Sequence, residues 1–479
     1  MVAPIRFVRP SPAVVLWAAA AAFAVGFGSL SILRHLAFNT GRFDLGNMVQ
    51  AVWATAHGDV LSVTDLQGDQ ISRLGAHFDP ILAAFAPLWW LWPDPTMLLA
   101  VQAAAIAVGA WPVFLLARKH LGSEWAGLGF GLAYLLYPPT QWLALNEFHA
   151  VALATPLLLL GFWYLDEDRL VAFAVVAALV CLTKEHMPLA IAALGVWYAL
   201  ARGRRRAGAA IAAAGTTVAA IAIGIVVPHF APAGTSAFEG RYRAVGGSPT
   251  GIVETMFTDP LRILEQAFGG HGIPYLLELL LPLLALPLLA PLAALTALPE
   301  LAANLLSSTR TQTSIHFHYT AGAIPGLMVA AVFGAAKLRA RQGRLRALVT
   351  AVVVVGIVSN YILGAIPVWR AFPGGESLAS REYEVTAHDR VAERALRLIP
   401  DDVVVSSTNS LGAHLSERRR VLSFPVLLDA EWIAADETRP GYADRVAPLA
   451  TSERLRRLRL DPLWRIVFDE DGIVLFRRR

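Results

Sequence analysis

Acidic and histidine side chains stand where several long apolar stretches of this sequence end, and the first of them is Asp44. It lies in NTGRFDLGNMVQAVWATAHGD (39–59), close behind an uncharged run from 11 to 33 that is long enough to cross a bilayer. Apolar residues at helical spacing predict an interfacial helix over 43–56, with Asp44 at its beginning. A carboxylate there can act as a general base toward a hydroxyl group, or as an N-cap that accepts backbone N–H groups. Residue chemistry alone leaves both roles open.

Two further clusters combine acids with histidines. LNEFHAV holds Glu147 and His149, and CLTKEHMPL holds Lys184, Glu185 and His186. Neither acid–histidine pair has the i, i+4 spacing with which two ligands share one helix face, so a metal site built from them would need ligands from several helices. The lysine suits either an ion pair within its cluster or the binding of a phosphate group.

Other polar residues are expected on the same face of the membrane. IHFHYTAGAIPG holds His316, His318 and Tyr319, which suit proton transfer, ligation or contact with a phosphate. His77 and Asp79 begin the stretch HFDPILAAFAPLWWLWPDP. Ionisable residues at the ends of membrane spans are costly and usually mark a functional cavity. We therefore interpret their concentration on one face as a binding site.

The composition is that of a membrane protein. The chain has 479 residues, of which 56% are hydrophobic and 16% charged, and its mean hydropathy is +0.54. Soluble domains usually carry about 25% charged residues. The last part, 371–479, holds 17 of the 40 Lys and Arg and 18 of the 36 Asp and Glu. This distribution predicts a transmembrane domain over 1–370, with an outer loop over 37–94 that carries the juxtamembrane helix, and a soluble domain over 371–479.

About eleven transmembrane helices are expected, over 11–35, 95–117, 124–145, 149–165, 169–184, 187–201, 208–229, 272–288, 291–307, 319–336 and 347–367. Basic clusters at 117–120, 201–206 and 337–346 fall between them, and short Lys/Arg-rich loops stay in the cytoplasm. This places the N-terminus in the cytoplasm and the C-terminal domain outside the cytoplasmic membrane. Segment 77–92 is not counted, because it reads as either a half-helix or a short crossing. The same clusters explain the net charge of +4, so no nucleic-acid partner is expected.

The C-terminal domain is expected to be a small α/β domain. A strand, a short helix bearing His414 and a second strand are predicted over 401–425, and a β-hairpin over 463–479 that turns at Asp469–Gly472. Strands that alternate with helical pieces indicate an α/β fold. We interpret the domain as an acceptor-binding module or as a structural one.

Four quoted stretches carry a resemblance to a known family. RFDLGNMVQAVWATAHGD, LGAHFDPILAAFAPLWWLWPDP, AYLLYPPTQWLALNEFHAVALATPLLL and LTKEHMPLAIAALGVW resemble a bacterial membrane-protein family, domain of unknown function 2079 (DUF2079), from about residue 38 to 370. The Ala-, Arg- and Gly-rich composition resembles that of members from high-GC actinobacteria. The family is in turn similar to the GT-C glycosyltransferases, which include protein O-mannosyltransferases and aminoarabinose lipid A transferases.

That resemblance implies a catalytic acid on the first outer loop, a polyprenyl-phosphate sugar donor and a soluble outer domain behind the membrane core. Asp44 matches the acid in position, and Lys184 resembles a lysine at the outer end of a later helix in the aminoarabinose branch. Many mannosyltransferases of the fold carry paired acids on this loop, whereas Asp44 here stands alone beside Leu45.

The leading hypothesis is a GT-C-like membrane glycosyltransferase, a mostly α polytopic protein in the lipid bilayer, which moves a sugar from a polyprenyl-phosphate donor to an extracytoplasmic acceptor. The acceptor would be a cell-envelope glycan, a glycolipid or a protein, and Asp44 would be the general base. The sequence has no Gly-rich phosphate loop or other nucleotide motif, which fits a lipid-linked donor. The expected substrate-binding residues are Arg42, His77, Asp79, Glu147, His149, Lys184, Glu185, His186, His316, His318 and Tyr319.

Two alternatives come from different classes. The first is a membrane transporter or lipid-handling protein without bond chemistry, because proline-broken helices such as those in 272–307 can line a substrate path. The gathering of polar residues at one face argues against it. The second is a metal-dependent membrane enzyme, in which a divalent metal ion would be held by Glu147, His149, Glu185 and His186.

Overall fold

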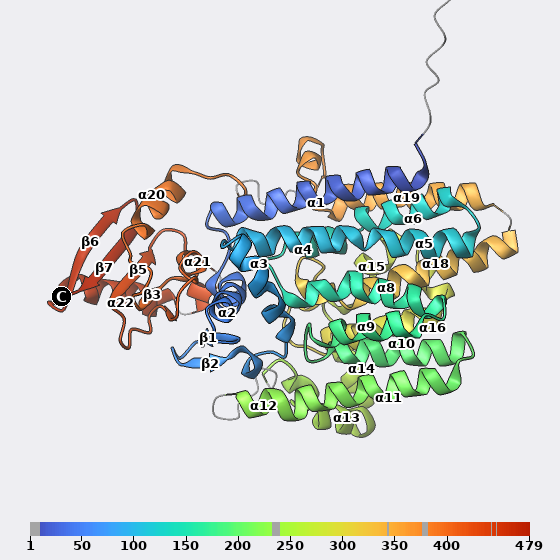
Figure 1. Ribbon diagram of the computed structural model, residues 1–479, viewed down its shortest axis with the longest axis horizontal. Helices are drawn as coiled ribbons and strands as arrows, with labels where there is room; N and C mark the ends of the chain where they lie inside the picture. The colour runs from blue at the N-terminus through green and yellow to red at the C-terminus, as the bar shows by residue number, and fades with distance from the viewer. Residues whose placement is uncertain (1–9, 232–239, 343, 376–381, 442, 447) are drawn as a thin grey trace, which may run out of the picture.

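The computed structural model describes residues 10–231, 240–342, 344–375, 382–441, 443–446 and 448–479. Figure 1 shows an elongated molecule with a bundle of apolar helices at one end and a β-sheet with its helices at the other. The first helix, α1 (Pro12–Leu36), runs along the bundle and ends beside the sheet. The short elements that follow α1 lie between the bundle and the sheet (Figure 1).

Among the described residues, four helical stretches are long and apolar enough to cross a membrane: Pro12–Leu36, Thr96–Leu121, Arg205–Phe230 and Leu345–Leu363. Shorter apolar helices accompany them, at Pro80–Leu91, Ala150–Asp166, Leu170–Cys181, Met187–Ala201 and Gly272–Leu283. The length and composition of these helices are those expected of a membrane protein. Eleven complete crossings stay a prediction.

Proline breaks several of the expected spans, since it cannot donate a backbone hydrogen bond within a helix. The stretch 124–145 divides into α6 (Glu124–Leu136) and α7 (Pro138–Leu145) at Pro138 and Pro139. The stretch 272–307 is a series of short pieces: α15 (Gly272–Leu280), η8 (Leu281–Leu283), η9 (Leu286–Leu289), α16 (Pro291–Ala294), η10 (Leu295–Ala297) and α17 (Leu298–Leu305). Segment 77–92 holds η3 (Pro80–Phe85) and α3 (Ala86–Leu91), which together are shorter than the roughly 20 residues of a full crossing.

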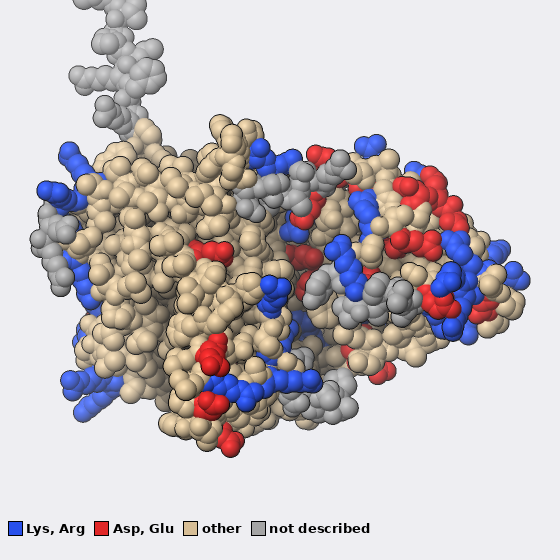
Figure 2. Space-filling model, turned by 180° about the vertical axis from the view of Figure 1, so that it is seen from behind, with Lys and Arg blue, Asp and Glu red and all other residues tan. Residues whose placement is uncertain are grey.

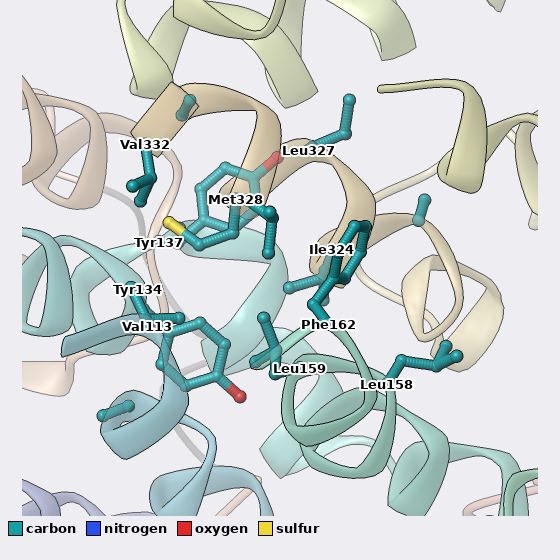
Figure 3. Close-up of a cluster of buried hydrophobic side chains, with 14 of the residues drawn as sticks. Val113, Tyr134, Tyr137, Leu158, Leu159, Phe162, Ile324, Leu327, Met328 and Val332 are labelled. Atoms are coloured by element: carbon teal, nitrogen blue, oxygen red, sulfur yellow. The ribbon is translucent and has the colours of Figure 1, made fainter. Parts of the chain in front are cut away.

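The largest hydrophobic core lies inside the helical bundle. It joins α5 (Ala110–Leu121), α6, α8 (Ala154–Asp166) and α18 (Ala323–Gln342), and Figure 3 shows Tyr134, Tyr137, Phe162 and Met328 packed within it. The two tyrosine hydroxyls are satisfied there: Tyr134 donates to the carbonyl of Ile106 at 2.8 Å and Tyr137 to that of Leu279 at 2.7 Å. The bundle therefore forms a close-packed frame for the loops at its ends.

Helices α10 (Met187–Ala201) and α11 (Arg205–Ile221) approach each other through glycines. A Cβ placed on Gly195 would lie 2.5 Å from the amide nitrogen of Ala212, and one on Gly208 would lie 2.5 Å from the carbonyl of Gly195. Gly215 is equally close to Ala192, at 2.6 Å. Small residues at such spacing let membrane helices pack backbone to backbone.

We expect Gly208→Leu to lower the melting temperature of the purified protein in detergent, because the side chain would force α10 and α11 apart. Gly224→Leu is the matched control: it lies in the same long stretch, Arg205–Phe230, and a Cβ there meets no atom within 4 Å. Equal melting temperatures for the two variants would contradict the proposed close packing.

The segment after α1 forms its own small core. It contains a π-helical turn η1 (Arg42–Gly46), helix α2 (Asn47–Ala56), the hairpin β1 (Ser62–Thr64) and β2 (Gln70–Ser72), and η2 (Arg73–Gly75). Leu45, Val49 and Val52 are buried there against Leu82 and Phe148. The expected helix over 43–56 is present, and its apolar face packs into the protein.

The C-terminal residues form a five-stranded sheet in the order β4-β3-β5-β7-β6. Its strands are β3 (Val405–Ser407), β4 (Val421–Ser423), β5 (Trp432–Asp436), β6 (Trp464–Glu470) and β7 (Ile473–Arg478). β3 pairs in parallel with β4 and β5, whereas β7 is antiparallel to β5 and β6. Helices α20 (Ala387–Leu396), α21 (Asn409–Ala413) and α22 (Pro448–Leu460) accompany the sheet, and we call residues 382–479 the C-terminal unit.

Charged side chains gather at the two ends of the molecule, and the face between them is largely uncharged apart from scattered acidic and basic groups (Figure 2). Where α5, α8 and α10 end, Asp166 is only 1% exposed and pairs with Lys119 at 2.6 Å, His120 at 2.9 Å and Arg202 at 3.3 Å. An uncharged belt between charged ends is the surface that a bilayer requires.

Candidate active site

Asp44 is held in place by the segment that carries it. The carboxylate of Glu147 accepts the N–H of Gly41 at 3.1 and 3.0 Å and the N–H of Leu45 at 2.9 Å, which fixes the beginning of η1. The Asp44 carboxylate itself accepts no backbone N–H from the described residues, and the residue before η1 is Gly41. The N-cap interpretation of Asp44 is therefore wrong for this structure. Its side chain is 45% exposed.

His149 is the partner of Asp44. Its Nε2 lies 3.5 Å from Oδ1 of Asp44, and its Nδ1 lies 2.6 Å from the backbone carbonyl of Glu147. Because a carbonyl oxygen only accepts, Nδ1 carries a proton and donates it to that carbonyl. The contact with Asp44 is then attractive when Nε2 is protonated too, as an imidazolium–carboxylate pair.

His318 supports His149 from the other side. The two imidazole rings are stacked, with centroids 3.6 Å apart, and Nδ1 of His318 lies 3.2 Å from Oδ1 of Asn146. Burial and the nearby charges of His149 and Lys184 hold the pKa of His318 well below its usual value. His318 is therefore a neutral ring stacked on His149.

Positive charge surrounds the Asp44 carboxylate. Burial raises the pKa of Asp44, but the His149 ring and the charges of Arg73 and Lys184 outweigh it and hold that pKa below its usual value. Nζ of Lys184 lies 5.7 Å from the ring centroid of Tyr319, and the guanidinium of Arg241 lies 5.9 Å from the same ring. The Lys184 ammonium forms no hydrogen bond or ion pair with any described residue, so its charge is available to a ligand.

Several expected site residues are engaged elsewhere. Nδ1 of His77 lies 3.1 Å from Glu185, whose other oxygen accepts the N–H of Phe78 at 3.0 Å. Asp79 forms an ion pair with Arg73 at 2.8 Å. The described bonds of His77, Glu185 and Asp79 therefore go to protein groups.

The four suggested metal ligands do not converge. Glu147 is bonded to backbone amides, Glu185 to His77, and Nε2 of His186 to Glu300 at 2.8 Å, while only His149 faces Asp44. Within the described part of the chain, no group of three or more His, Cys, Asp or Glu side chains is arranged to hold a metal ion. This geometry therefore gives no support to the alternative of a metal-dependent enzyme that uses these four residues.

Arg42 and His316 also depart from expectation. Arg42 is 2% exposed and its guanidinium donates to Val421, Ser423 and Thr64. It joins η1 to the C-terminal unit, so the interpretation as a substrate-binding residue is corrected. His316 is exposed and packs edge-on against Trp142, with ring centroids 4.4 Å apart.

Sequence reasoning missed several polar residues of this region. Arg73 and Arg241 are the two missed cations, and Glu300 and Asn304 pair with His186 and with the Tyr319 carbonyl. A signal for the last two exists: in LPELAANLL they are polar residues four apart within an apolar, proline-rich run, so they share one helix face. Nothing local marks Arg73 and Arg241.

A groove of about 850 Å³ lies apart from this cluster, between α2 and the C-terminal unit. Trp53 and His57 of α2 face Asp401, Glu417 and Arg419 across it, and none of the residues expected in the site lines it. The groove has perturbed groups of its own, since burial and the nearby carboxylates of Asp94 and Asp401 raise the pKa of Glu417 to about 7. We assign the candidate site to the Asp44 cluster because the polar residues that the sequence marks at the helix ends gather there and not in the groove.

The apolar helices and the Asp44–His149 cluster at their ends define a membrane protein with a GT-C-like fold. The crystal structure of ArnT from Cupriavidus metallidurans in the apo state, a GT-C glycosyltransferase, matches with a TM-score of 0.51 at 16% sequence identity, over 97% of this chain and 98% of that one. At this identity the match shows the fold alone. The chain belongs to the family described as predicted membrane protein DUF2079, whose model matches residues 34–475. No curated protein matches the sequence significantly.

Proposed function

We propose that this protein transfers a sugar from a polyprenyl-phosphate donor to an acceptor outside the cytoplasmic membrane: a cell-envelope glycan, a glycolipid or a protein. The observation that carries the proposal is the Asp44 carboxylate, which is partly exposed, lies 3.5 Å from Nε2 of His149 and is close to the charges of Arg73 and Lys184. The GT-C-like fold supports the reaction class.

In the proposed reaction, Asp44 accepts the proton of the acceptor hydroxyl while the hydroxyl oxygen attacks the anomeric carbon of the sugar. The bond between that carbon and the phosphate oxygen breaks, and its electron pair leaves with the polyprenyl phosphate. Lys184 and Arg241, which both approach the ring of Tyr319, would stabilise the negative charge of the departing phosphate. His149 would hold the Asp44 carboxylate ionised and in position.

The orientation in the membrane belongs to the same proposal. The N-terminus and the basic segments 117–120, 201–206 and 337–346 would face the cytoplasm, and the Asp44 cluster and the C-terminal unit would face outward. Residues 1–370 would form the membrane domain, of which 1–9, 232–239 and 343 lie outside the described residues. A lipid-linked donor would reach the site from the bilayer.

The test is a transfer assay on purified protein with radiolabelled polyprenyl-phosphate sugars. We expect the wild type to release polyprenyl phosphate, and Lys184→Gln to raise the KM for the donor about 10- to 100-fold, which corresponds to a lost charge-assisted hydrogen bond of about 1.5–3 kcal/mol. Lys337→Gln is the control, because Lys337 is exposed on α18 and its ammonium donates to the carbonyl of Leu289 on η9. Absence of turnover with every donor in the wild type would count against the proposed function, and unchanged donor KM in Lys184→Gln would count against the phosphate site.

A further inference from the structure

The segment that carries Asp44 is held from two sides, and only one of them belongs to the helical bundle. On the bundle side, Glu147 accepts the N–H of Leu45, the residue after Asp44. On the opposite side, the side-chain oxygen of Asn409 accepts the N–H of Phe43, the residue before Asp44, at 3.0 Å. Asn409 is the first residue of α21 in the C-terminal unit. The backbone on both sides of Asp44 is therefore fixed by long-range contacts.

Arg42 makes the strongest of these contacts. Its Nε donates to the carbonyl of Val421 at 3.0 Å and its Nη1 to the hydroxyl of Ser423 at 2.6 Å, both on strand β4. Its Nη2 donates to the carbonyl of Thr64 on β1 at 2.7 Å. The guanidinium thus joins η1, the outer hairpin and the C-terminal sheet. A buried arginine with this many partners leaves little freedom to the backbone that carries it.

Glycines permit the close approach of η1 and α21. A Cβ on Gly46 would lie 2.5 Å from the hydroxyl of Ser416, and one on Gly412 would lie 2.8 Å from Cβ of Arg42. Asn409 is fixed in turn, because its N–H donates to the carboxylate of Asp444 at 3.0 and 3.1 Å. The C-terminal unit therefore packs closely against the Asp44 segment, because glycines in both let the two backbones come close together.

We propose that the C-terminal unit is part of the catalytic centre, because it positions Asp44 through Arg42 and Asn409. This inference rests on the proposed function, and it assigns the unit a role other than acceptor binding. Arg42 and Asn409 are positioning residues: neither touches substrate, and each acts through the backbone next to Asp44. Releasing them would let the carboxylate move relative to His149 and the acceptor hydroxyl, and a misplacement of about 1 Å can cost about 10²-fold in rate.

The experiment compares Arg42→Gln and Asn409→Ala with Arg420→Gln. Arg420 is a matched control, because it also joins the C-terminal unit to the outer segment, but through the carbonyl of Gly68 at 3.0 and 2.6 Å. We expect Arg42→Gln to lower kcat about 10²-fold, and Asn409→Ala to lower it less, with the donor KM within about two-fold of wild type in both. Arg420→Gln is expected to keep the wild-type kcat.

Hydrogen–deuterium exchange of residues 41–50 is the second readout. It should rise in Arg42→Gln and Asn409→Ala and stay at the wild-type level in Arg420→Gln. If Arg42→Gln does not fold, Asn409→Ala decides alone. Equal losses of kcat in all three variants, or unchanged exchange in the first two, would overturn the inference. A wild type that turns over no donor would count against the proposed function, whereas the exchange data would still decide whether the C-terminal unit holds this segment.

Discussion

Replacing Asp44 by asparagine is expected to lower sugar transfer about 10²- to 10⁴-fold, the range that a positioned general base contributes. Asparagine keeps the size of the side chain and cannot accept the proton of the acceptor hydroxyl. Donor binding should persist, since Lys184 and Arg241 remain, so the loss should appear in kcat with little change in the donor KM. The measurement is release of polyprenyl phosphate by the purified variant beside wild type.

Asp59→Asn is the matched control for this variant. Asp59 lies in the same segment between α1 and α4 (Thr96–Val108), is exposed, and makes no side-chain hydrogen bond with a described residue. Equal turnover by Asp44→Asn and wild type would show that another group accepts the proton. Because the pKa of Asp44 lies below its usual value, protonation of this carboxyl should not reduce wild-type activity between pH 7 and pH 5.

Asp79→Ala is expected to reduce the free energy of unfolding by about 3–5 kcal/mol, the cost of removing one partner of a buried ion pair. The side chains of Arg73 and Asp79 are 5% and 4% exposed, and the guanidinium contacts both carboxylate oxygens, at 3.1 Å and 2.8 Å to Oδ2 and 3.2 Å to Oδ1. The variant would leave the Arg73 charge buried without its partner. Unfolding in mixed micelles with increasing dodecyl sulfate would measure the change.

Two further variants make the stability result specific. Asp69→Ala removes an exposed acid from the neighbouring hairpin loop and should change stability by less than about 0.5 kcal/mol. The double variant Arg73→Leu/Asp79→Leu removes both charges and should be more stable than Asp79→Ala, because no buried charge is left unpaired. A double variant that is less stable than Asp79→Ala would contradict this account of the pair.

Much of the architecture could be predicted from local patterns. Apolar runs and low charge indicate a membrane protein because a bilayer excludes charged groups, and the same cost makes each polar residue at a helix end conspicuous. Asp44, His149, Lys184, His318 and Tyr319 were all recognisable in this way. The strands on either side of His414 and the final hairpin follow from alternating patterns and from the turn at Asp471 and Gly472.

The partners of these residues were decided by tertiary structure. Arg42 and Glu147 have the chemistry of substrate-binding groups, yet Arg42 bonds to Val421, 379 residues away, and Glu147 to the amide of Gly41, 106 residues away. His186 likewise bonds to Glu300, 114 residues away. Contacts of this separation depend on how whole helices and the C-terminal sheet pack, and no local spacing specifies them.

The sequence by itself therefore determined which residue types stand at the ends of the helices, because desolvation acts on each side chain separately. Only the tertiary structure decided which of them are free to act. Hydrogen-bonding capacity is limited, so a carboxylate or guanidinium that is saturated by backbone groups is held for structure, as in Glu147 and Arg42. Asp44 and Lys184 stand out because the Asp44 side chain stays half-exposed beside His149, and the Lys184 ammonium has no hydrogen-bond partner among the described residues.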